Sequence, residues 1–236
     1  MEAALAERRR TPELMDDPEL ERGRHVRALR ALDRVNVVSL ATGRLWAEVA
    51  RLAPALDTGA PVRVLDVACG GGDVLRRVAV RAARAGVAVE LHGCDVSEVA
   101  LDYARSCSGS DPRLRWLRLD ALRDELPTGY DLVCSSLFLH HLDEGQAVAL
   151  LRQMADATAD TMLVQDLRRS RLGFALAWLG LHALTTSDVA RADGLTSVAA
   201  AFTLEEARGL CARAGLEGAT VRACWPRRFA IRWARA

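Results

Sequence analysis

The 236-residue sequence predicts an α/β fold, a doubly wound and mostly parallel sheet of seven strands with helices on both faces. Two observations predict this fold. Short runs rich in valine and leucine alternate with amphipathic helical segments, and a glycine-rich loop follows the first of these runs. Because such alternation requires crossover connections between strands, most neighbouring strands should run parallel.

The individual elements follow from the same pattern. Strands are expected at 62–67, 89–94, 114–119, 130–135 and 161–166, followed by two short strands at 219–224 and 228–233, with the last strand antiparallel. Helices are expected at 18–34, 36–53, 73–86, 97–107, 144–157 and 171–185, and a further helix begins at Thr203 with a Thr-x-x-Glu capping box.

A break precedes the first strand of this pattern. Pro54 and the segment 57–61, which contains glycine and proline, interrupt the chain there. We therefore expect an N-terminal helical cap over residues 1–57 and the main domain over residues 58–236.

Composition removes several classes of protein. The 32 basic residues nearly balance the 31 acidic ones, which disfavours a nucleic-acid partner. Every basic residue is arginine, and enzymes that use a Schiff base, pyridoxal phosphate or a P-loop need lysine. The six cysteines form no C-x-x-C pair and the N-terminus has no secretory signal pattern, so we expect free thiols and a cytoplasmic protein. The apolar run 172–181 is too short to span a bilayer.

The most informative segment is the strand and loop from Val62 to Val74. A dinucleotide-binding G-x-G-x-x-G loop that began at Gly70 and Gly72 would place its third glycine at Leu75, so nicotinamide or flavin binding is disfavoured. The loop instead shows an acidic residue, Asp66, followed by three small residues at Ala68, Gly70 and Gly72.

Later segments continue this pattern in the same order. Asp95 ends the second strand and Asp120 ends the third. The fourth strand and the residues after it form a D-x-V-x-S-x-x-x-x-H-H-L stretch that begins at Asp131 and ends at Leu142. Over residues 62–142 the sequence resembles the class I S-adenosylmethionine-dependent methyltransferases, in particular the small-molecule branch that acts in quinone and natural-product pathways. Alanine at position 68, where the family has glycine, is a departure that requires this residue to avoid a strongly positive φ.

The resemblance implies a cofactor site. It would bind S-adenosylmethionine and release S-adenosylhomocysteine, with Asp95 on the ribose hydroxyls and Asp120 at the adenine. The implied cofactor-binding residues are Asp66, Ala68, Cys69, Gly70, Gly72, Asp95, Val96, Asp120, Ala121, Ser135 and Ser136. The alternatives are a helix N-cap for Asp95, although Ser97 can cap that helix itself, and an ordinary turn aspartate for Asp120.

Histidines after the fourth strand are candidates for catalysis. Methyl transfer requires alignment of the nucleophile with the sulfonium carbon, and a hydroxyl nucleophile also benefits from a base. Because adjacent residues are not expected to face the same ligand, we assign His140 as the base and His141 as structural, with Asp166 orienting the histidine or the substrate. The alternative is that both histidines are helix caps or packing groups.

The apolar helix at 171–185 bears on the substrate. Together with the N-terminal helices it could cover the methyl donor, which favours an aromatic or hydrophobic small molecule and phenolic O-methylation in bacterial secondary metabolism. C-methylation of a quinone or polyketide ring and N-methylation remain open, as does a core or homodimer role for the helix. A non-catalytic binding subunit and an oxidoreductase are the alternatives from other classes.

The residues at the end of the fourth strand argue against two other classes of methyltransferase. Ser135, Ser136 and Leu137 stand where metal-dependent catechol methyltransferases carry carboxylates, so no metal is expected. The same stretch lacks the N/D-P-P-Y/F sequence of nucleic-acid amino methyltransferases, which again disfavours a nucleic-acid substrate.

Overall fold

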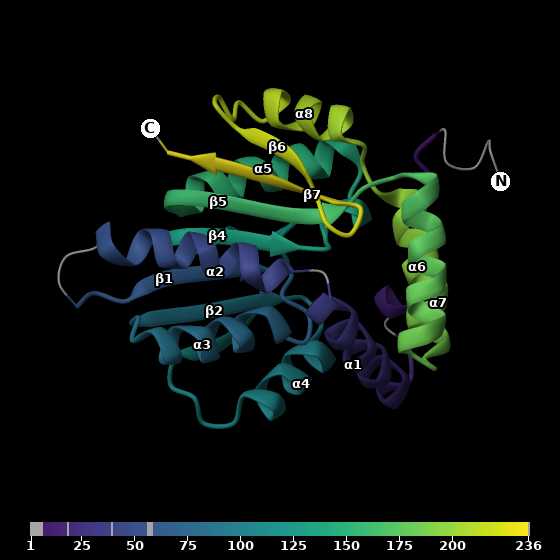
Figure 1. The fold of residues 1–236 in the computed structure, drawn as a ribbon, viewed down its shortest axis with the longest axis horizontal. Helices are drawn as coiled ribbons and strands as arrows, with labels where there is room; N and C mark the ends of the chain where they lie inside the picture. The colour runs from purple at the N-terminus through teal and green to yellow at the C-terminus, as the bar shows by residue number, and fades with distance from the viewer. Residues whose placement is uncertain (1–6, 18, 39, 56–58, 236) are drawn as a thin grey trace.

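A computed structural model describes residues 7–17, 19–38, 40–55 and 59–235 (Figure 1). Its centre is a seven-stranded sheet with the order β3-β2-β1-β4-β5-β7-β6. The first five strands pair in parallel, and β7 runs antiparallel to both of its neighbours. The predicted doubly wound fold with an antiparallel last strand is confirmed.

The elements lie close to their predicted positions. The strands are β1 (Val62–Val67), β2 (Val89–Asp95), β3 (Leu114–Arg118), β4 (Tyr130–Ser136), β5 (Thr158–Leu167), β6 (Thr220–Cys224) and β7 (Arg228–Ala234). The α-helices are α1 (Arg22–Val38), α2 (Ala41–Leu52), α3 (Asp73–Ala85), α4 (Glu98–Ser108), α5 (Glu144–Ala157), α6 (Arg171–Leu184), α7 (Asp188–Ala200) and α8 (Leu204–Arg213). Short 3-10 turns are η1 (Leu14–Asp16), η2 (Ala53–Ala55) and η3 (Leu139–His141).

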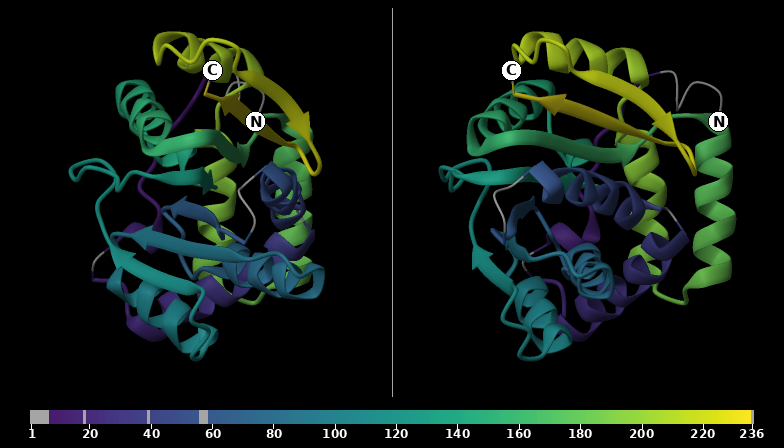
Figure 2. Two further views of the ribbon diagram at one scale, coloured as in Figure 1. Left: turned by 90° about the vertical axis from the view of Figure 1, so that its left-hand side faces the viewer. Right: turned by 60° about the vertical axis from the view of Figure 1, so that its left-hand side comes forward.

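Helices cover both faces of the sheet, as the apolar runs require. Helices α2 and α3 pack with β1 in one buried cluster, and α5 and α8 pack in another on the opposite face. The two layers are visible in the rotated views of Figure 2. Almost all β1 side chains are buried, as is typical of a central strand in a parallel sheet. Its sequence therefore lacks the strict alternation of apolar and polar residues that a half-buried strand shows.

Three helices form a cap at the carboxyl edge of the sheet. Helices α6 and α7 pack as a pair against α1, with Ala28, Ala31, Val189 and Ala190 in the buried contact (Figure 1). Helix α7 was not predicted, because it buries Asp193 and Ser197 and has little apolar periodicity. Its buried polar residues bind the segment before α1, as described below.

Helix α2, which precedes the first strand, packs into the main core. Leu45, Val49 and Leu52 of α2 lie in the same buried cluster as β1 and α3. The expected domain boundary between residues 57 and 58 lies outside the described residues.

Among the described residues, no helix is long and apolar enough to cross a membrane. All six cysteines are free; Cys94, Cys134 and Cys211 are buried, whereas Cys107 is exposed.

Candidate active site

The glycine-rich loop turns the chain sharply from β1 into α3. Gly70 and Gly72 have φ values of 53° and 68°, in the left-handed region that glycine adopts at little cost. A side chain at Gly72 would also collide with the Trp116 ring, which lies 2.2 Å from the position of a Cβ atom. Glycine suits position 70 because of its backbone conformation. It suits position 72 for the same reason and because a side chain there would collide with Trp116.

Ala68 adopts the conformation that we expected it to avoid. Its φ of 56° lies in the left-handed region, so the expectation from the sequence is wrong. The chain must turn immediately after β1, and the loop takes that turn even at a residue with a Cβ atom. The left-handed conformation costs a non-glycine residue about 1–2 kcal/mol.

Asp95 joins the tip of β2 to the glycine loop. One of its oxygens accepts the Gly70 N–H at 2.8 Å and the other accepts the Ser97 N–H at 2.9 Å. Ser97 caps α4 through its own side chain, so Asp95 is not needed as the cap. Burial raises the pKa of Asp95, and these backbone hydrogen bonds oppose the rise. The carboxylate therefore lies where it can hold the loop and face a ligand.

The neighbouring cofactor candidates lie along the same edge. Asp120 accepts the Leu122 N–H at 3.0 Å, which is the turn interaction considered as its alternative. Ala121 is buried, whereas Val96 is exposed. The part of these residues in binding a cofactor remains a prediction.

Two candidates at β1 and β4 are buried between the strands. Burial raises the pKa of Asp66 to about 7, although the Cys134 thiol donates a weak hydrogen bond to it at 3.5 Å. The Ser135 hydroxyl donates to the Val67 carbonyl at 2.8 Å, which ties β4 to β1 below the loop. Ser136 is half-buried at the end of β4, and Cys69 donates its backbone N–H to Cys94 at 3.0 Å.

His140 and Asp166 form a buried pair at the ends of η3 and β5. Nδ1 of His140 lies 2.6 Å from Asp166 Oδ1, and the His140 backbone N–H donates to the other oxygen at 2.8 Å. Burial favours the neutral imidazole, but the charge and hydrogen bond of Asp166 outweigh it and raise the pKa of His140 to about 10. Burial favours the protonated carboxyl, but the imidazolium holds the pKa of Asp166 below its usual value. The contact expected between these residues is present.

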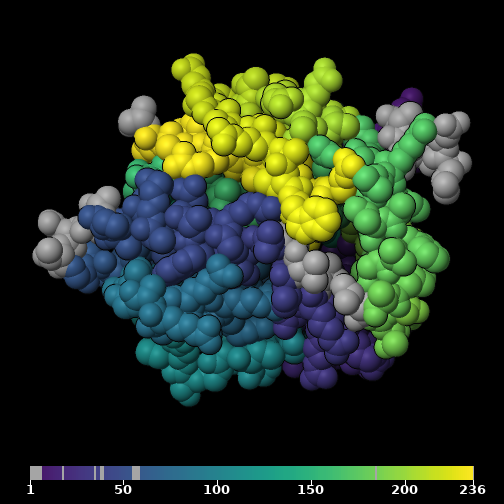
Figure 3. Space-filling view, viewed as in Figure 1, coloured from purple at the N-terminus to yellow at the C-terminus, as the bar shows by residue number. Residues whose placement is uncertain are grey.

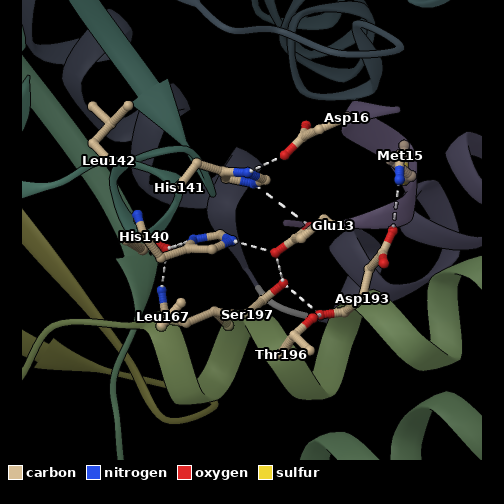
Figure 4. Close-up of polar contacts among 12 residues, drawn as sticks. Glu13, Met15, Asp16, His140, His141, Leu142, Leu167, Asp193, Thr196 and Ser197 are labelled. Atoms are coloured by element: carbon tan, nitrogen blue, oxygen red, sulfur yellow. Dashed lines mark hydrogen bonds and ion pairs between the residues drawn. The ribbon is translucent and has the colours of Figure 1, made fainter. Parts of the chain in front are cut away.

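His141 faces the same group as His140, contrary to our expectation. Nε2 of His140 lies 3.6 Å from one oxygen of Glu13, and Nε2 of His141 lies 3.7 Å from the other (Figure 4). The 3-10 turn places the two imidazole rings side by side, with centroids 4.4 Å apart. Nδ1 of His141 contacts Asp16 at 3.0 Å, so a carboxylate orients this ring as well.

The segment 7–17 covers the two histidines. Arg8 donates to the carbonyls of His140 and Leu142 at 2.9 and 2.6 Å. The N–H groups of Leu14 and Met15 donate to the Asp193 carboxylate on α7, at 2.8 and 3.0 Å. As a result, only 3 % of the His140 side chain and 10 % of the Glu13 side chain are exposed.

Sequence reasoning missed Glu13 and the α7 residues that hold this segment. Ser197 donates a hydrogen bond to Glu13, and Asp193 lies one helical turn away on α7. Glu13 stands in the polar stretch Pro12–Asp17, but no short-range spacing connects that stretch to His140. Only tertiary structure brings these groups together.

Comparisons with known proteins agree with the fold. A family model described as a methyltransferase domain matches residues 64–161. Human N-acetylserotonin methyltransferase in complex with SAM is 17% identical, with 100% of this chain and 65% of that chain covered and a TM-score of 0.64. A SAM dependent methyltransferase from Aquifex aeolicus is 14% identical over 92% of this chain and 100% of that chain, with a TM-score of 0.61.

A third solved structure is magnesium protoporphyrin IX methyltransferase from Synechocystis with bound SAH. It is 15% identical over 83% of each chain, with a TM-score of 0.57. No curated protein matches the sequence. The solved structures share the fold of this chain, and the family match identifies a methyltransferase domain within it. The matched segment runs from β1 to the start of β5.

Proposed function

We propose that this enzyme transfers the methyl group of S-adenosylmethionine to a hydroxyl of a small aromatic or hydrophobic molecule. The observation that carries the proposal is the shared carboxyl edge of the sheet. The glycine loop and Asp95 end β1 and β2, while the His140–Asp166 pair lies at the ends of β4 and β5. Ligands of doubly wound sheets bind at this edge, near the point where the strand order reverses.

On the β1–β2 side, the chain's own groups suit a nucleoside with a charged amino-acid tail. The loop at Gly70 and Gly72 presents backbone without side chains, and Asp95 offers two acceptor oxygens for ribose hydroxyls. Asp66, Ala68, Cys69, Val96, Asp120, Ala121, Ser135 and Ser136 complete the proposed cofactor site. When bound, S-adenosylmethionine supplies an electrophilic methyl group on a sulfonium.

On the β4–β5 side, His140 is the proposed base. Despite burial, Asp166 and Glu13 raise the pKa of this ring to about 10, so it acts as a base only after it loses its proton, and withdrawal of Glu13 favours that loss. Nε2 of the neutral ring would then take the proton of the substrate hydroxyl as the oxygen forms its bond to the methyl carbon, while the carbon–sulfur bond breaks and a neutral thioether leaves. Asp166 holds Nδ1 and orients the ring for this step. Because Nε2 faces Glu13 at 3.6 Å in this structure, a substrate reaches it only after the Glu13 side chain withdraws.

The cap supports a hydrophobic substrate. Helices α1, α6 and α7 close over the sheet edge, and the Phe138 ring lies 6.0 Å from that of His141. The outer face of α6 is exposed at Leu172, Leu176, Trp178 and Leu179, as the space-filling view shows for the helix (Figure 3). A homodimer through this face remains a prediction, as does a cytoplasmic location.

Calorimetry and a methylation screen test the proposed function. We expect S-adenosylmethionine and S-adenosylhomocysteine to bind, NADH not to bind, and phenols to accept the methyl group. A product methylated on carbon or nitrogen would overturn the hydroxyl assignment while keeping methyl transfer. Cofactor binding without turnover on any acceptor would instead favour a non-catalytic binding subunit.

A further inference from the structure

Three side chains with metal-ligating atoms converge beneath the segment 7–17. Glu13 lies between His140 and His141, and one ligand atom of each residue lies within 4.8 Å of the others (Figure 4). The two histidines come from η3, at the end of β4, and Glu13 immediately precedes η1. Two imidazoles and one carboxylate form a common ligand set for zinc and other divalent transition metals.

The separations between these atoms suit coordination better than hydrogen bonding. The distances of 3.6 and 3.7 Å from Nε2 of each histidine to the Glu13 oxygens exceed those of N–H···O hydrogen bonds. Ligand atoms bonded to one tetrahedral zinc ion at about 2.1 Å lie about 3.4 Å from each other. The two histidine–Glu13 distances are close to this separation, and all three ligand atoms lie within 4.8 Å of one another.

The surroundings orient both imidazoles for this role. Asp166 holds Nδ1 of His140 at 2.6 Å, and Asp16 holds Nδ1 of His141 at 3.0 Å. Metal-bound histidines are usually supported in this way, by a carboxylate or carbonyl on the nitrogen that does not bind the metal. Ser197 donates to Glu13 and fixes the third ligand from α7.

The charges of the cluster also favour a cation. Three carboxylates contact the two histidines: Glu13 and Asp166 are buried or nearly so, whereas Asp16 lies at the exposed side of the cluster. We propose that Glu13, His140 and His141 bind one divalent transition-metal ion, of which zinc is the simplest case. The expectation of no metal considered only carboxylates that follow the fourth strand, whereas Glu13 comes from the N-terminal segment.

Metal binding would have a consequence for the active site. The ion bonds to Nε2 of His140, the same atom that acts as the base in the proposed function. It also connects Glu13 to η3 and so holds the segment 7–17 closed. The metal-bound form therefore lacks a free base; this consequence depends on the proposed function, whereas metal binding itself does not.

A direct binding measurement tests the site. Full-length protein without an affinity tag, freed of metal with a chelator, is titrated with Zn²⁺ by calorimetry and with Co²⁺ by absorption. We expect one ion per chain with micromolar or tighter affinity, and a cobalt spectrum without the charge-transfer band of a thiolate ligand. Failure of any metal to bind, or a thiolate band that places the ion on cysteine, would overturn the proposal.

Variants locate the ion. Glu13→Gln and His141→Asn should each weaken binding by at least about tenfold, as should Asp16→Ala, which keeps all three ligands but removes the support of His141. His182→Asn is the matched control, because this exposed histidine on α6 contacts the Trp178 carbonyl far from the cluster. Circular dichroism of the metal-free variants confirms that they fold. Unchanged affinity in folded Glu13→Gln and His141→Asn would contradict the site. Loss of cofactor binding is a separate measurement and tests only the proposed function.

Discussion

The two halves of the sheet edge are constructed differently. On the β1–β2 side the contacts are made by short stretches at the strand ends, and Asp95 reaches Gly70 directly across two paired strands. On the β4–β5 side His140 contacts Asp166 and also Glu13, which comes from the beginning of the chain. The proposed cofactor half is thus encoded in local motifs, whereas the proposed substrate half depends on where the N-terminal segment packs.

Removal of the proposed base should separate the two halves most clearly. His140→Ala should lower kcat by about 10²- to 10⁴-fold, the usual contribution of general acid–base catalysis. Its affinity for S-adenosylmethionine should stay unchanged, because the glycine loop and Asp95 are untouched. Steady-state kinetics on a phenol that the enzyme methylates, with chelator present, and calorimetry provide the two readouts. A variant that loses cofactor affinity but keeps kcat would contradict the assignment of cofactor binding to the β1–β2 side and of the base to the β4–β5 side.

Close packing under the glycine loop should make Gly72 sensitive to a single methyl group. Gly72→Ala should lower the free energy of unfolding by about 2–4 kcal/mol, because the new Cβ would collide with Trp116 and φ stays positive. Gly86→Ala is the matched control, since Gly86 has a φ of 66° and nothing within 4 Å of its Cβ position. That control should lose only about 1 kcal/mol. Equal losses in urea denaturation would show that Trp116 does not matter.

Asp66 should reduce stability at neutral pH. Its folded pKa of about 7 lies above its ordinary value of 3.8, so ionisation opposes folding increasingly as pH rises between these values. Asp66→Asn removes this penalty, and its gain in unfolding free energy should be larger by about 2 kcal/mol at pH 8 than at pH 5. The exposed Asp156→Asn serves as the control. A gain that is independent of pH would contradict the assigned cause.

Ala68 offers the smallest expected effect on the cofactor half. Ala68→Gly should raise the free energy of unfolding by about 1 kcal/mol, because glycine adopts the left-handed conformation without a Cβ penalty. Thermal and urea denaturation of the cofactor-free protein measure this gain. A loss of stability in this variant would mean that the Ala68 methyl contributes more through packing than it costs in conformation.

The same comparison explains what the sequence could predict. The strands and the helices α3, α4 and α5 were predicted within a few residues, because period, caps and glycines are local signals. Asp95, the acidic residue that ends β2, was predicted for the same reason. Local signals also led to the wrong expectation at Ala68, since a mild residue difference says nothing about the backbone angle that the turn imposes.

The substrate half was predicted only in part. Asp166 was identified because it ends a strand of the predicted sheet, and His140 because it lies in the H-H-L stretch that follows the fourth strand; parallel strand ends meet at one edge. Glu13 lies far away in sequence, and α7 replaces apolar periodicity with the buried Asp193 and Ser197. The shared orientation of His140 and His141 depends on the 3-10 turn and on Glu13, neither of which the sequence indicated.

The most direct test of the central claim is calorimetric titration of the purified chain with S-adenosylmethionine, in parallel with Asp95→Ala and with NADH as the control ligand. We expect micromolar binding of S-adenosylmethionine that the substitution abolishes, and no binding of NADH. Absence of S-adenosylmethionine binding, or binding of NADH in its place, would contradict the claim.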